Sequence, residues 1–186
     1  MKLLIMGPPG VGKGTQADRI KDILKIIHLS TGEILREEIR INSDIGIKAK
    51  MYMDDGMLVP DSILLQIVQQ KITQPICQNG YLLDGFPRTI PQANGLEKIM
   101  TTLGHKLDYA ISLNADTDEL IERLIKRGKE SGRNDDTPEV IRNRQKIYWQ
   151  QTAPLLEYYG KKGILKDVDA LGTISEITNR ILEITK

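Results

Sequence analysis

A glycine-rich segment that directly follows an apolar run carries the clearest chemical signal in the chain. Residues 7–15 read Gly-Pro-Pro-Gly-Val-Gly-Lys-Gly-Thr, and the expected strand Lys2–Met6 precedes them. Glycines allow backbone conformations that other residues rarely adopt, so that successive N–H groups can point at one anion. A helix that begins near Lys13 adds the positive end of its dipole. We therefore expect a phosphate site, with Lys13 reaching the β- and γ-phosphates and the Thr15 hydroxyl near them and any bound magnesium.

One detail departs from the general phosphate-loop pattern, in which Ser or Thr directly follows the lysine. This chain has Gly14 there, and Thr15 stands one place later. The plainer interpretation is a glycine-rich turn without a ligand. The strand before the turn and the helix after it favour the phosphate site.

A second candidate site follows the apolar strand Tyr81–Asp84. A carboxylate at the end of a strand beside a phosphate loop can organise magnesium, directly or through water, which is the role expected for Asp84. Arg88 comes four residues later, on an expected turn, where its guanidinium group can grip a second phosphate with two hydrogen bonds. Without Arg88, an Asp that merely ends a strand and caps a helix would be the preferred interpretation.

Arginines recur where phosphoryl transfer could use them, because that reaction needs positioning and charge stabilisation more than a nucleophile. The alternative for any one of them is a surface residue that pairs with a nearby carboxylate. We keep that alternative for Arg19, Arg40, Arg142 and Arg180. The candidates are Arg36, Arg88, Arg123, Arg127, Arg133 and Arg144.

The elements that must position these residues follow a regular alternation of short apolar runs and helix-period segments. Continuous apolar runs are typical of parallel strands that are covered on both faces. The chain is therefore predicted to be an α/β protein with a doubly wound, five-stranded parallel sheet in three layers, which binds ligands at the carboxyl ends of its strands. The expected strands are Lys2–Met6, His28–Ser30, Tyr81–Asp84, Tyr109–Leu113 and Ile164–Val168.

Helices are expected between these strands. Asp61 is placed to cap one of them. Another follows Asp116, and a long one begins near Thr137 and should kink or restart at Pro154. Two segments break the alternation: residues 30–59 form a small helical excursion, and residues 126–136 are short, polar and glycine-containing, as in a closing flap. A plain surface loop is the alternative for residues 126–136.

The composition narrows the class of protein. With 26 basic and 25 acidic residues the net charge is +1, so no broad field favours nucleic acid or an anionic membrane. No apolar run approaches the roughly 20 residues that a membrane-spanning helix needs. The N-terminus leads straight into a strand rather than a signal peptide. The single cysteine, Cys77, excludes an internal disulfide and a cysteine cluster for zinc, and we expect one cytoplasmic domain.

Taken in order, these motifs resemble the adenylate kinases, a family within the nucleoside monophosphate kinases. The similarity includes the unusual Gly14 and extends over nearly the whole chain. The matching segments are Gly7–Thr15, His28–Gly32 with Arg36, Gly56–Asp61, Asp84–Thr89 with Gln92, Arg123, Arg127, Ser131–Arg133, Asp135–Asp136 and Arg144. The resemblance implies a single kinase domain in residues 1–186, with a core (1–29, 60–125 and 137–186), a monophosphate-binding segment (30–59) and a short lid (126–136).

For ATP, the resemblance implies contacts from the phosphate loop, from Arg127 to the adenine or the phosphates, and from the backbone of Gly172 to the adenine. Asp84 would order the water shell of the Mg²⁺ that accompanies ATP. No structural zinc is implied, because the short lid lacks the long insert that carries a Cys-rich site in some relatives. The loop residues that would hold ATP are Gly10, Val11, Gly12, Lys13, Gly14 and Thr15.

For AMP, the resemblance implies a second set of contacts on the acceptor side. Arg133 and Arg144 would bridge toward its phosphate and the transferred group, and Arg123 would join the charge clamp. The implied catalytic residues are Lys13, Asp84, Arg88, Arg123, Arg133 and Arg144. The other implied AMP contacts are Thr31, Arg36, the backbone of Met57, Leu58 and Val59, then Gly85, Phe86, Pro87, Arg88 and Gln92.

The implied activity is reversible transfer of the terminal phosphoryl group from Mg·ATP to AMP, giving two ADP and serving adenine nucleotide homeostasis. Thr31 and Gln92 favour AMP, because related pyrimidine kinases usually have Ala and Asn there and a Gln amide can pair with an adenine edge. The nearest alternative is a kinase of UMP, CMP or another nucleoside monophosphate. A P-loop binding switch such as a GTPase is disfavoured by the acceptor-side arginines and by the lack of a guanine-reading Asn/Thr-Lys-x-Asp motif. The implied partners are ATP, AMP and ADP, with no nucleic acid or membrane, and a monomer is expected.

Overall fold

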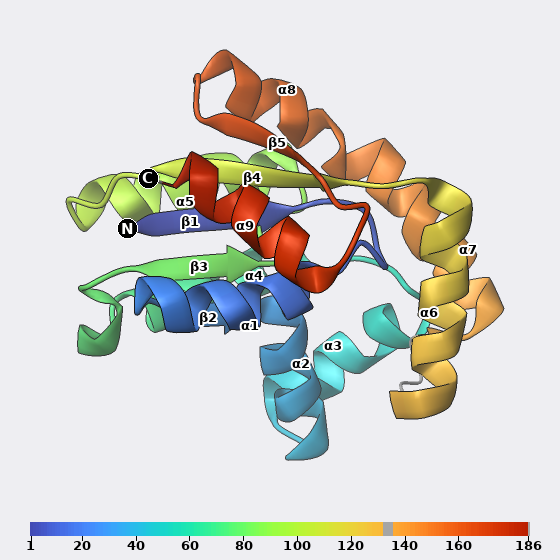
Figure 1. The fold of residues 1–186 in the computed structure, drawn as a ribbon. Coiled ribbons are helices and arrows are strands. Elements are labelled where there is room, and N and C mark those ends of the chain that lie inside the picture. The colour runs from blue at the N-terminus through green and yellow to red at the C-terminus, as the bar shows by residue number, and fades with distance from the viewer. Residues whose placement is uncertain (132–135, 186) are drawn as a thin grey trace.

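The computed structural model describes residues 1–131 and 136–185 and has a parallel β-sheet at its centre (Figure 1). The sheet has five strands in the order β2-β3-β1-β4-β5, and every neighbouring pair is parallel. Both properties confirm the expected fold, and the expected strand boundaries agree with the observed ones to within one residue. The strands are β1 (Lys2–Met6), β2 (Ile27–Ser30), β3 (Tyr81–Asp84), β4 (Tyr109–Asn114) and β5 (Leu165–Asp169).

Helices cover both faces of the sheet, and the side chains of β1 alternate between two hydrophobic cores. Leu3 and Ile5 belong to one core, whereas Leu4 and Met6 belong to the other. The first core includes residues of α1 (Lys13–Leu24) and α9 (Ile174–Ile184), and the second includes residues of α4 (Asp61–Ile72), α5 (Ile90–Thr102) and α8 (Pro154–Lys161). The three layers therefore follow from the period-two alternation of a strand that is buried on both faces.

The carboxyl ends of three neighbouring strands meet at one edge of the sheet. Ile5 of β1 is in register with Asp84 of β3, which is also in register with Ser30 of β2. The phosphate loop follows β1, the turn with Arg88 follows β3, and the helical excursion follows β2. Sheet register thus brings the three candidate segments together, as expected for this class of fold.

The helical excursion consists of α2 (Thr31–Arg40) and α3 (Asp44–Asp54), which extend below the sheet in Figure 1. Serine side chains begin both helices: the Ser30 hydroxyl accepts a hydrogen bond from the Glu33 N–H, and the Ser43 hydroxyl accepts one from the Gly46 N–H. Such caps satisfy N–H groups that the first turn of a helix leaves without a partner.

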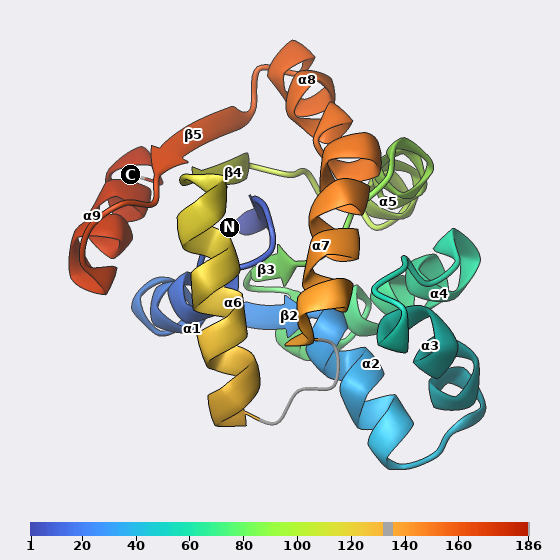
Figure 2. The ribbon, with the colours of Figure 1, turned by 90° about the vertical axis from the view of Figure 1, so that its right-hand side faces the viewer.

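Two helices cross the carboxyl ends of the strands (Figure 2). They are α6 (Thr117–Ser131) and α7 (Pro138–Ile147). The segment that was expected as a short, polar flap therefore begins inside α6. A π-helical turn, Tyr148–Thr152, separates α7 from α8, and α8 starts at Pro154, where the sequence predicted a kink or restart.

The expectation that Asp61 caps α4 is wrong. Pro60 holds the N-cap position, and Asp61 is the first residue within the helix. A capping side chain must precede the helix in order to reach the N–H groups of its first turn. The Asp61 carboxylate instead accepts hydrogen bonds from Thr89 and Gln92 at the start of α5.

Candidate active site

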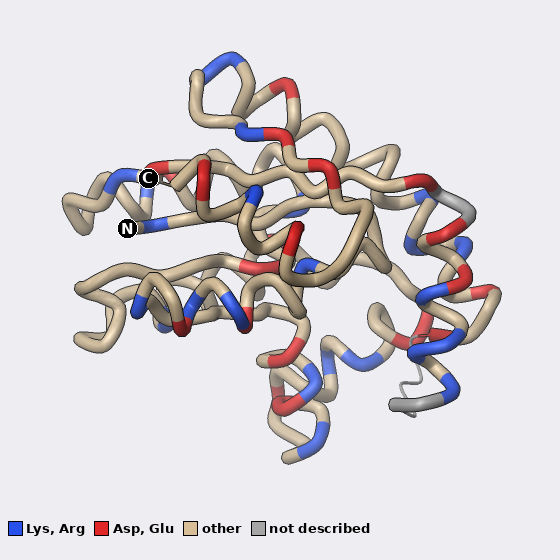
Figure 3. Tube along the Cα trace, viewed as in Figure 1, with Lys and Arg blue, Asp and Glu red and all other residues tan. Residues whose placement is uncertain are grey.

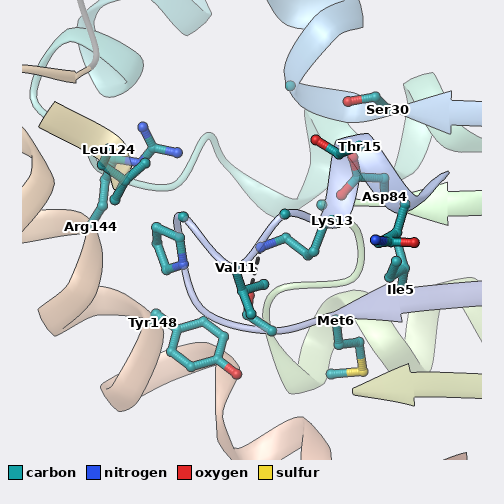
Figure 4. A pocket seen from close by; sticks show the side chains of 18 of the residues that line it. Ile5, Met6, Val11, Lys13, Thr15, Ser30, Asp84, Leu124, Arg144 and Tyr148 are labelled. Carbon is teal, nitrogen blue, oxygen red and sulfur yellow. Dashed lines mark hydrogen bonds between the residues drawn. The ribbon is translucent and has the colours of Figure 1, made fainter. Parts of the chain in front are cut away.

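A cavity of about 570 Å³ opens at the carboxyl ends of β1 and β3, and most of the candidate residues line it. Figure 4 shows Lys13, Thr15 and Asp84 on one side of this cavity and Arg144 on another. The sequence-predicted residues that line it are Gly10, Val11, Gly12, Lys13, Gly14, Thr15, Arg36, Leu58, Asp84, Gly85, Pro87, Arg88, Arg123, Arg127, Arg144 and Gly172.

The phosphate loop needs glycine where the backbone turns against neighbouring segments. Gly7 has a φ of 140°, and a Cβ there would lie 2.5 Å from the Leu113 carbonyl oxygen. Gly10 has a φ of 91°, and a Cβ there would lie 2.6 Å from the Leu120 carbonyl oxygen. Other side chains are therefore excluded by both strain and collision, which fixes the path of the loop over the end of the sheet.

Lys13 lies over its own loop, where its Nζ donates hydrogen bonds to the carbonyl oxygens of Gly7 (2.7 Å) and Pro8 (3.0 Å). Burial lowers the pKa of Lys13 to about 7. The negative charge of Asp84 opposes this shift, whereas the positive charges of nearby arginines add to it: Arg88, Arg144 and Arg127. Keeping the Lys13 ammonium group charged in this loop therefore costs free energy. An anion that binds here would relieve that cost.

Asp84 is held by a histidine that the sequence analysis did not single out. The Nε2 atom of His28 lies 3.4 Å from Asp84 Oδ2, and its Nδ1 atom lies 3.2 Å from Asp18 Oδ1. Burial works against the charged imidazole, but the hydrogen bonds and charges of Asp84 and Asp18 outweigh it and raise the pKa of His28. The imidazole therefore links α1, β2 and β3 beneath the phosphate loop.

Oxygen ligands for a hard cation are present in the same part of the cavity. The Asp84 carboxylate and the Thr15 hydroxyl both line it (Figure 4). Mg²⁺ prefers oxygen donors and usually keeps several of its waters. This donor set therefore fits Mg²⁺ held between the protein, water and a phosphate group. Within residues 1–131 and 136–185 no cluster of three or more His, Cys, Asp or Glu side chains suits a metal ion.

Arg88 is fixed on the turn after β3 by contacts on three sides. Its Nε donates to the Gly85 carbonyl oxygen (2.7 Å), and its backbone N–H donates to Gln92 Oε1 (2.7 Å). The Thr152 hydroxyl, from the π-helical turn, donates to the Arg88 carbonyl oxygen (2.9 Å). Glycine suits position 85 because its φ of 76° lies in the left-handed region, and a Cβ there would also lie 3.0 Å from the Arg88 guanidinium group. The expected turn geometry for Arg88 is therefore present.

Asp136 pairs with arginines from α6 and α7, a contact that the sequence analysis missed. Its fully buried carboxylate accepts two hydrogen bonds from Arg127, at 2.7 Å each, and one from Arg144 at 2.9 Å. The three residues come from α6, α7 and the segment between them. A signal was present, since Asp136 stands among arginines in the sequence, but no local pattern identifies which of them it pairs with.

The remaining candidates lie at the margins of the cavity or outside it. Arg123 lines the cavity and pairs with Glu119 on α6. The loop that carries Gly172 is held by Arg180, whose guanidinium group donates to the carbonyl oxygens of Asp169 (2.9 Å) and Leu171 (2.6 Å). Arg133 lies outside the described residues. Basic residues recur along α6 and α7 beside the cavity (Figure 3).

Five predicted AMP contacts do not line the cavity: Thr31, Met57, Val59, Phe86 and Gln92. Met57 is exposed, whereas the other four are buried. The Thr31 hydroxyl donates to the carbonyl oxygens of Asp84 (3.3 Å) and Gly85 (3.0 Å), so that it braces the turn after β3. Gln92 bonds to Asp61 and to the Arg88 backbone.

Known proteins are similar to this chain over most or all of its length. The profile of the family described as "Adenylate kinase" matches residues 5–164. A Stenotrophomonas maltophilia protein named "Adenylate kinase" is 46% identical over 186 residues, which is 100% of both chains. Proteins of the same name from Leptospira biflexa (45% identical, 98% of both chains) and Renibacterium salmoninarum (47% identical, 97% of this chain and 94% of the relative) are also similar. Among the described residues, no helix has both the length and the apolar character that crossing a membrane would require.

Proposed function

The chain belongs to the adenylate kinase family, and we propose that it transfers the terminal phosphoryl group of Mg·ATP to AMP through the residues of this cavity, forming two ADP. The protein is a phosphotransferase of the nucleoside monophosphate kinase class. One observation carries the assignment of the site. The phosphate loop with Lys13 faces the same cavity as arginines from α2, α6, α7 and the turn after β3. Phosphoryl transfer requires this combination of positioning and positive charge.

On the donor side, the backbone N–H groups of residues 10–15 would surround the ATP phosphates. Lys13 would exchange its two carbonyl partners for phosphate oxygens. The cost of holding its charge in the buried loop supports this role, because phosphate would offset it. Arg127 and the backbone of Gly172 would contact the rest of the nucleotide.

On the acceptor side, Arg36 and Arg88 would hold the AMP phosphate, since both line the same cavity as the loop. Arg144 would reach toward the transferred group, and Arg123 would add to the clamp. Contacts from the Thr31 and Gln92 side chains require a shift of the groups that cover them, because both side chains are buried. We also propose that the backbone of Met57 and Val59 contacts AMP, as does Phe86. Arg133 is proposed as an AMP contact by resemblance alone.

Magnesium bound with ATP would supply positive charge that offsets the negative charge of the phosphate groups during transfer. Asp84 would orient the waters around it, and Thr15 would lie nearby. His28 would keep the Asp84 carboxylate turned toward the cavity.

Transfer to AMP rather than to water requires that the closed site exclude solvent. Residues of α2, α6 and α7 line the cavity. Figure 2 shows these helices at the carboxyl ends of the strands, with α3 packed beside α2. These segments are the elements that we propose to close over the bound nucleotides. We also propose a monomer that acts in the cytoplasm, and light scattering of the purified protein tests the monomer.

The proposal is tested by following the ³¹P spectrum of purified protein with Mg·ATP and AMP. Two ADP should appear for each ATP and AMP consumed, and the reaction should run backward from ADP with Mg²⁺. Release of inorganic phosphate without consumption of AMP would contradict the proposed function.

A further inference from the structure

Asp61 joins the start of α4 to the start of α5 through two hydrogen bonds. Its Oδ1 atom accepts from Gln92 Nε2 (2.7 Å), and its Oδ2 atom accepts from the Thr89 hydroxyl (3.1 Å). The Thr89 hydroxyl also accepts from the Gln92 backbone N–H (3.2 Å), which caps α5. Asp61 is therefore tied to Gln92 both directly and through Thr89, although 31 residues separate the two in sequence.

These contacts determine which way the Gln92 amide faces. A carboxylate only accepts hydrogen bonds, so the Asp61 side must meet the Nε2 group. A backbone N–H only donates, so the Arg88 side must meet Oε1, at 2.7 Å. A flipped amide would turn oxygen toward carboxylate and N–H toward N–H, and it would lose both bonds. Gln92 is 0% exposed, so bulk water does not replace them.

One donor and one acceptor of this amide remain for a ligand. An amide nitrogen can donate twice and its oxygen can accept twice, and Asp61 and Arg88 use one of each. Adenine presents an amino donor beside a ring-nitrogen acceptor, which is the pattern that a Gln amide matches. A base with a carbonyl at the same position and a hydrogen on N1, such as hypoxanthine, presents the reverse pattern and requires the flipped amide.

We propose that Asp61 is a positioning residue for base selection: it prevents the Gln92 amide from flipping and thereby makes the acceptor site favour adenine over bases with the reversed hydrogen-bonding edge. The inference rests on the proposed function, in which Gln92 contacts the base of the acceptor nucleotide. A base reaches the amide only by displacing the groups that cover it, and the orientation fixed beforehand decides which base gains two bonds there.

The test compares AMP with IMP, which has the same purine size and the reversed edge. In Asp61→Asn the carboxamide can either donate or accept, so that a flipped Gln92 amide loses only the bond from the Arg88 backbone N–H and no longer both bonds. The ratio of kcat/KM for AMP to that for IMP should fall about tenfold or more, because a mispaired buried polar group is what the wild-type site rejects. Asp61→Glu, which keeps an acceptor-only carboxylate, should retain more of the selectivity than Asp61→Asn.

Asp44→Asn is the matched control. Asp44 is also the first residue of a helix, α3, and it is exposed, so this variant removes the same charge from a helix start without contact with Gln92. The AMP/IMP ratio should stay at the wild-type value in this control. Thermal unfolding of each variant separates loss of selectivity from loss of the fold. If Asp61→Asn does not fold, Asp61→Ser takes its place, since a hydroxyl can also donate to a flipped amide.

The outcomes separate this inference from the proposed function. An unchanged AMP/IMP ratio in folded Asp61→Asn or Asp61→Ser overturns the inference while the kinase assignment stands. Wild-type protein that uses IMP as well as AMP also overturns it, whatever the variants do. Wild-type protein that phosphorylates neither nucleotide contradicts the proposed function itself.

Discussion

Single side chains in this site combine positive charge with burial, which is unfavourable without a ligand. Lys13 is the extreme case, since burial and the nearby guanidinium groups lower its pKa to about 7. Groups with such shifts tend to mark functional sites, because their cost is retained only where activity needs it.

The substitution Lys13→Met should therefore separate activity from stability. We expect kcat/KM for phosphoryl transfer to fall about 100-fold or more, because one preorganised charge is lost. The thermal midpoint of the nucleotide-free protein should not fall, because a buried ammonium group is replaced by an apolar chain of similar length. A lower midpoint with near-normal turnover would contradict this account of Lys13.

Arg88 provides a second test of a single side chain. Arg88→Ala should lower kcat/KM about 100-fold or more, because a fixed guanidinium group on the cavity wall is removed. Arg142→Ala is the control, since Arg142 is exposed on α7 and does not line the cavity. That control should change kcat/KM less than about threefold. Similar small effects from both variants would show that Arg88 does not stabilise phosphate charge during transfer.

The helices at the end of the sheet place these side chains through contacts that are distant in sequence. Asp136 links Arg127 of α6 to Arg144 of α7. The neighbouring Gln145 donates from Nε2 to the Pro9 carbonyl oxygen (3.0 Å), so that α7 is also joined to the phosphate loop. A change at Asp136 should therefore affect both helices.

Asp136→Asn should lower the free energy of unfolding by about 1–3 kcal/mol, because Arg127 and Arg144 lose a buried carboxylate; partial exposure of Arg127 keeps the loss below that of a fully buried pair. Glu119→Gln is the control, since it breaks the partly exposed pair with Arg123 on α6. That loss should be about 0–1 kcal/mol. Denaturant unfolding measures both, and equal losses would show that Asp136 is no more than a surface partner.

Local sequence patterns predicted the structural features that depend on residues close together in the sequence. The strands, the phosphate loop, the turn at Arg88 and the restart at Pro154 all follow from apolar runs, glycines and prolines within a few residues. Contacts made across the fold were missed: Asp61 was expected to cap its own helix but bonds to Gln92, and the contacts of His28 with Asp84 and Asp18 were not anticipated. The partner of a polar side chain depends on which segments the sheet brings together, which no local pattern contains.

For the molecule as a whole, His28 links stability to pH. Its folded pKa is raised above the ordinary value of 6.5 by Asp84 and Asp18, so the charged imidazole stabilises the folded state. This contribution is fully present below the unfolded pKa and is lost as the pH rises through the folded pKa. The wild-type protein should therefore lose its advantage in unfolding free energy over His28→Gln as the pH rises from below 6.5 through the raised folded pKa. A constant difference across that range would contradict a stabilising role for the contacts of His28 with Asp84 and Asp18.

The measurement that tests the account most directly is ADP formation from Mg·ATP with AMP, CMP, UMP and GMP offered separately. The account predicts a strong preference for AMP and, without any acceptor, little hydrolysis of ATP, because the closed site excludes water. Preference for a pyrimidine nucleotide would retain the fold and the phosphate site but overturn the assignments of Thr31 and Gln92. Transfer to none of the four would contradict the proposed reaction.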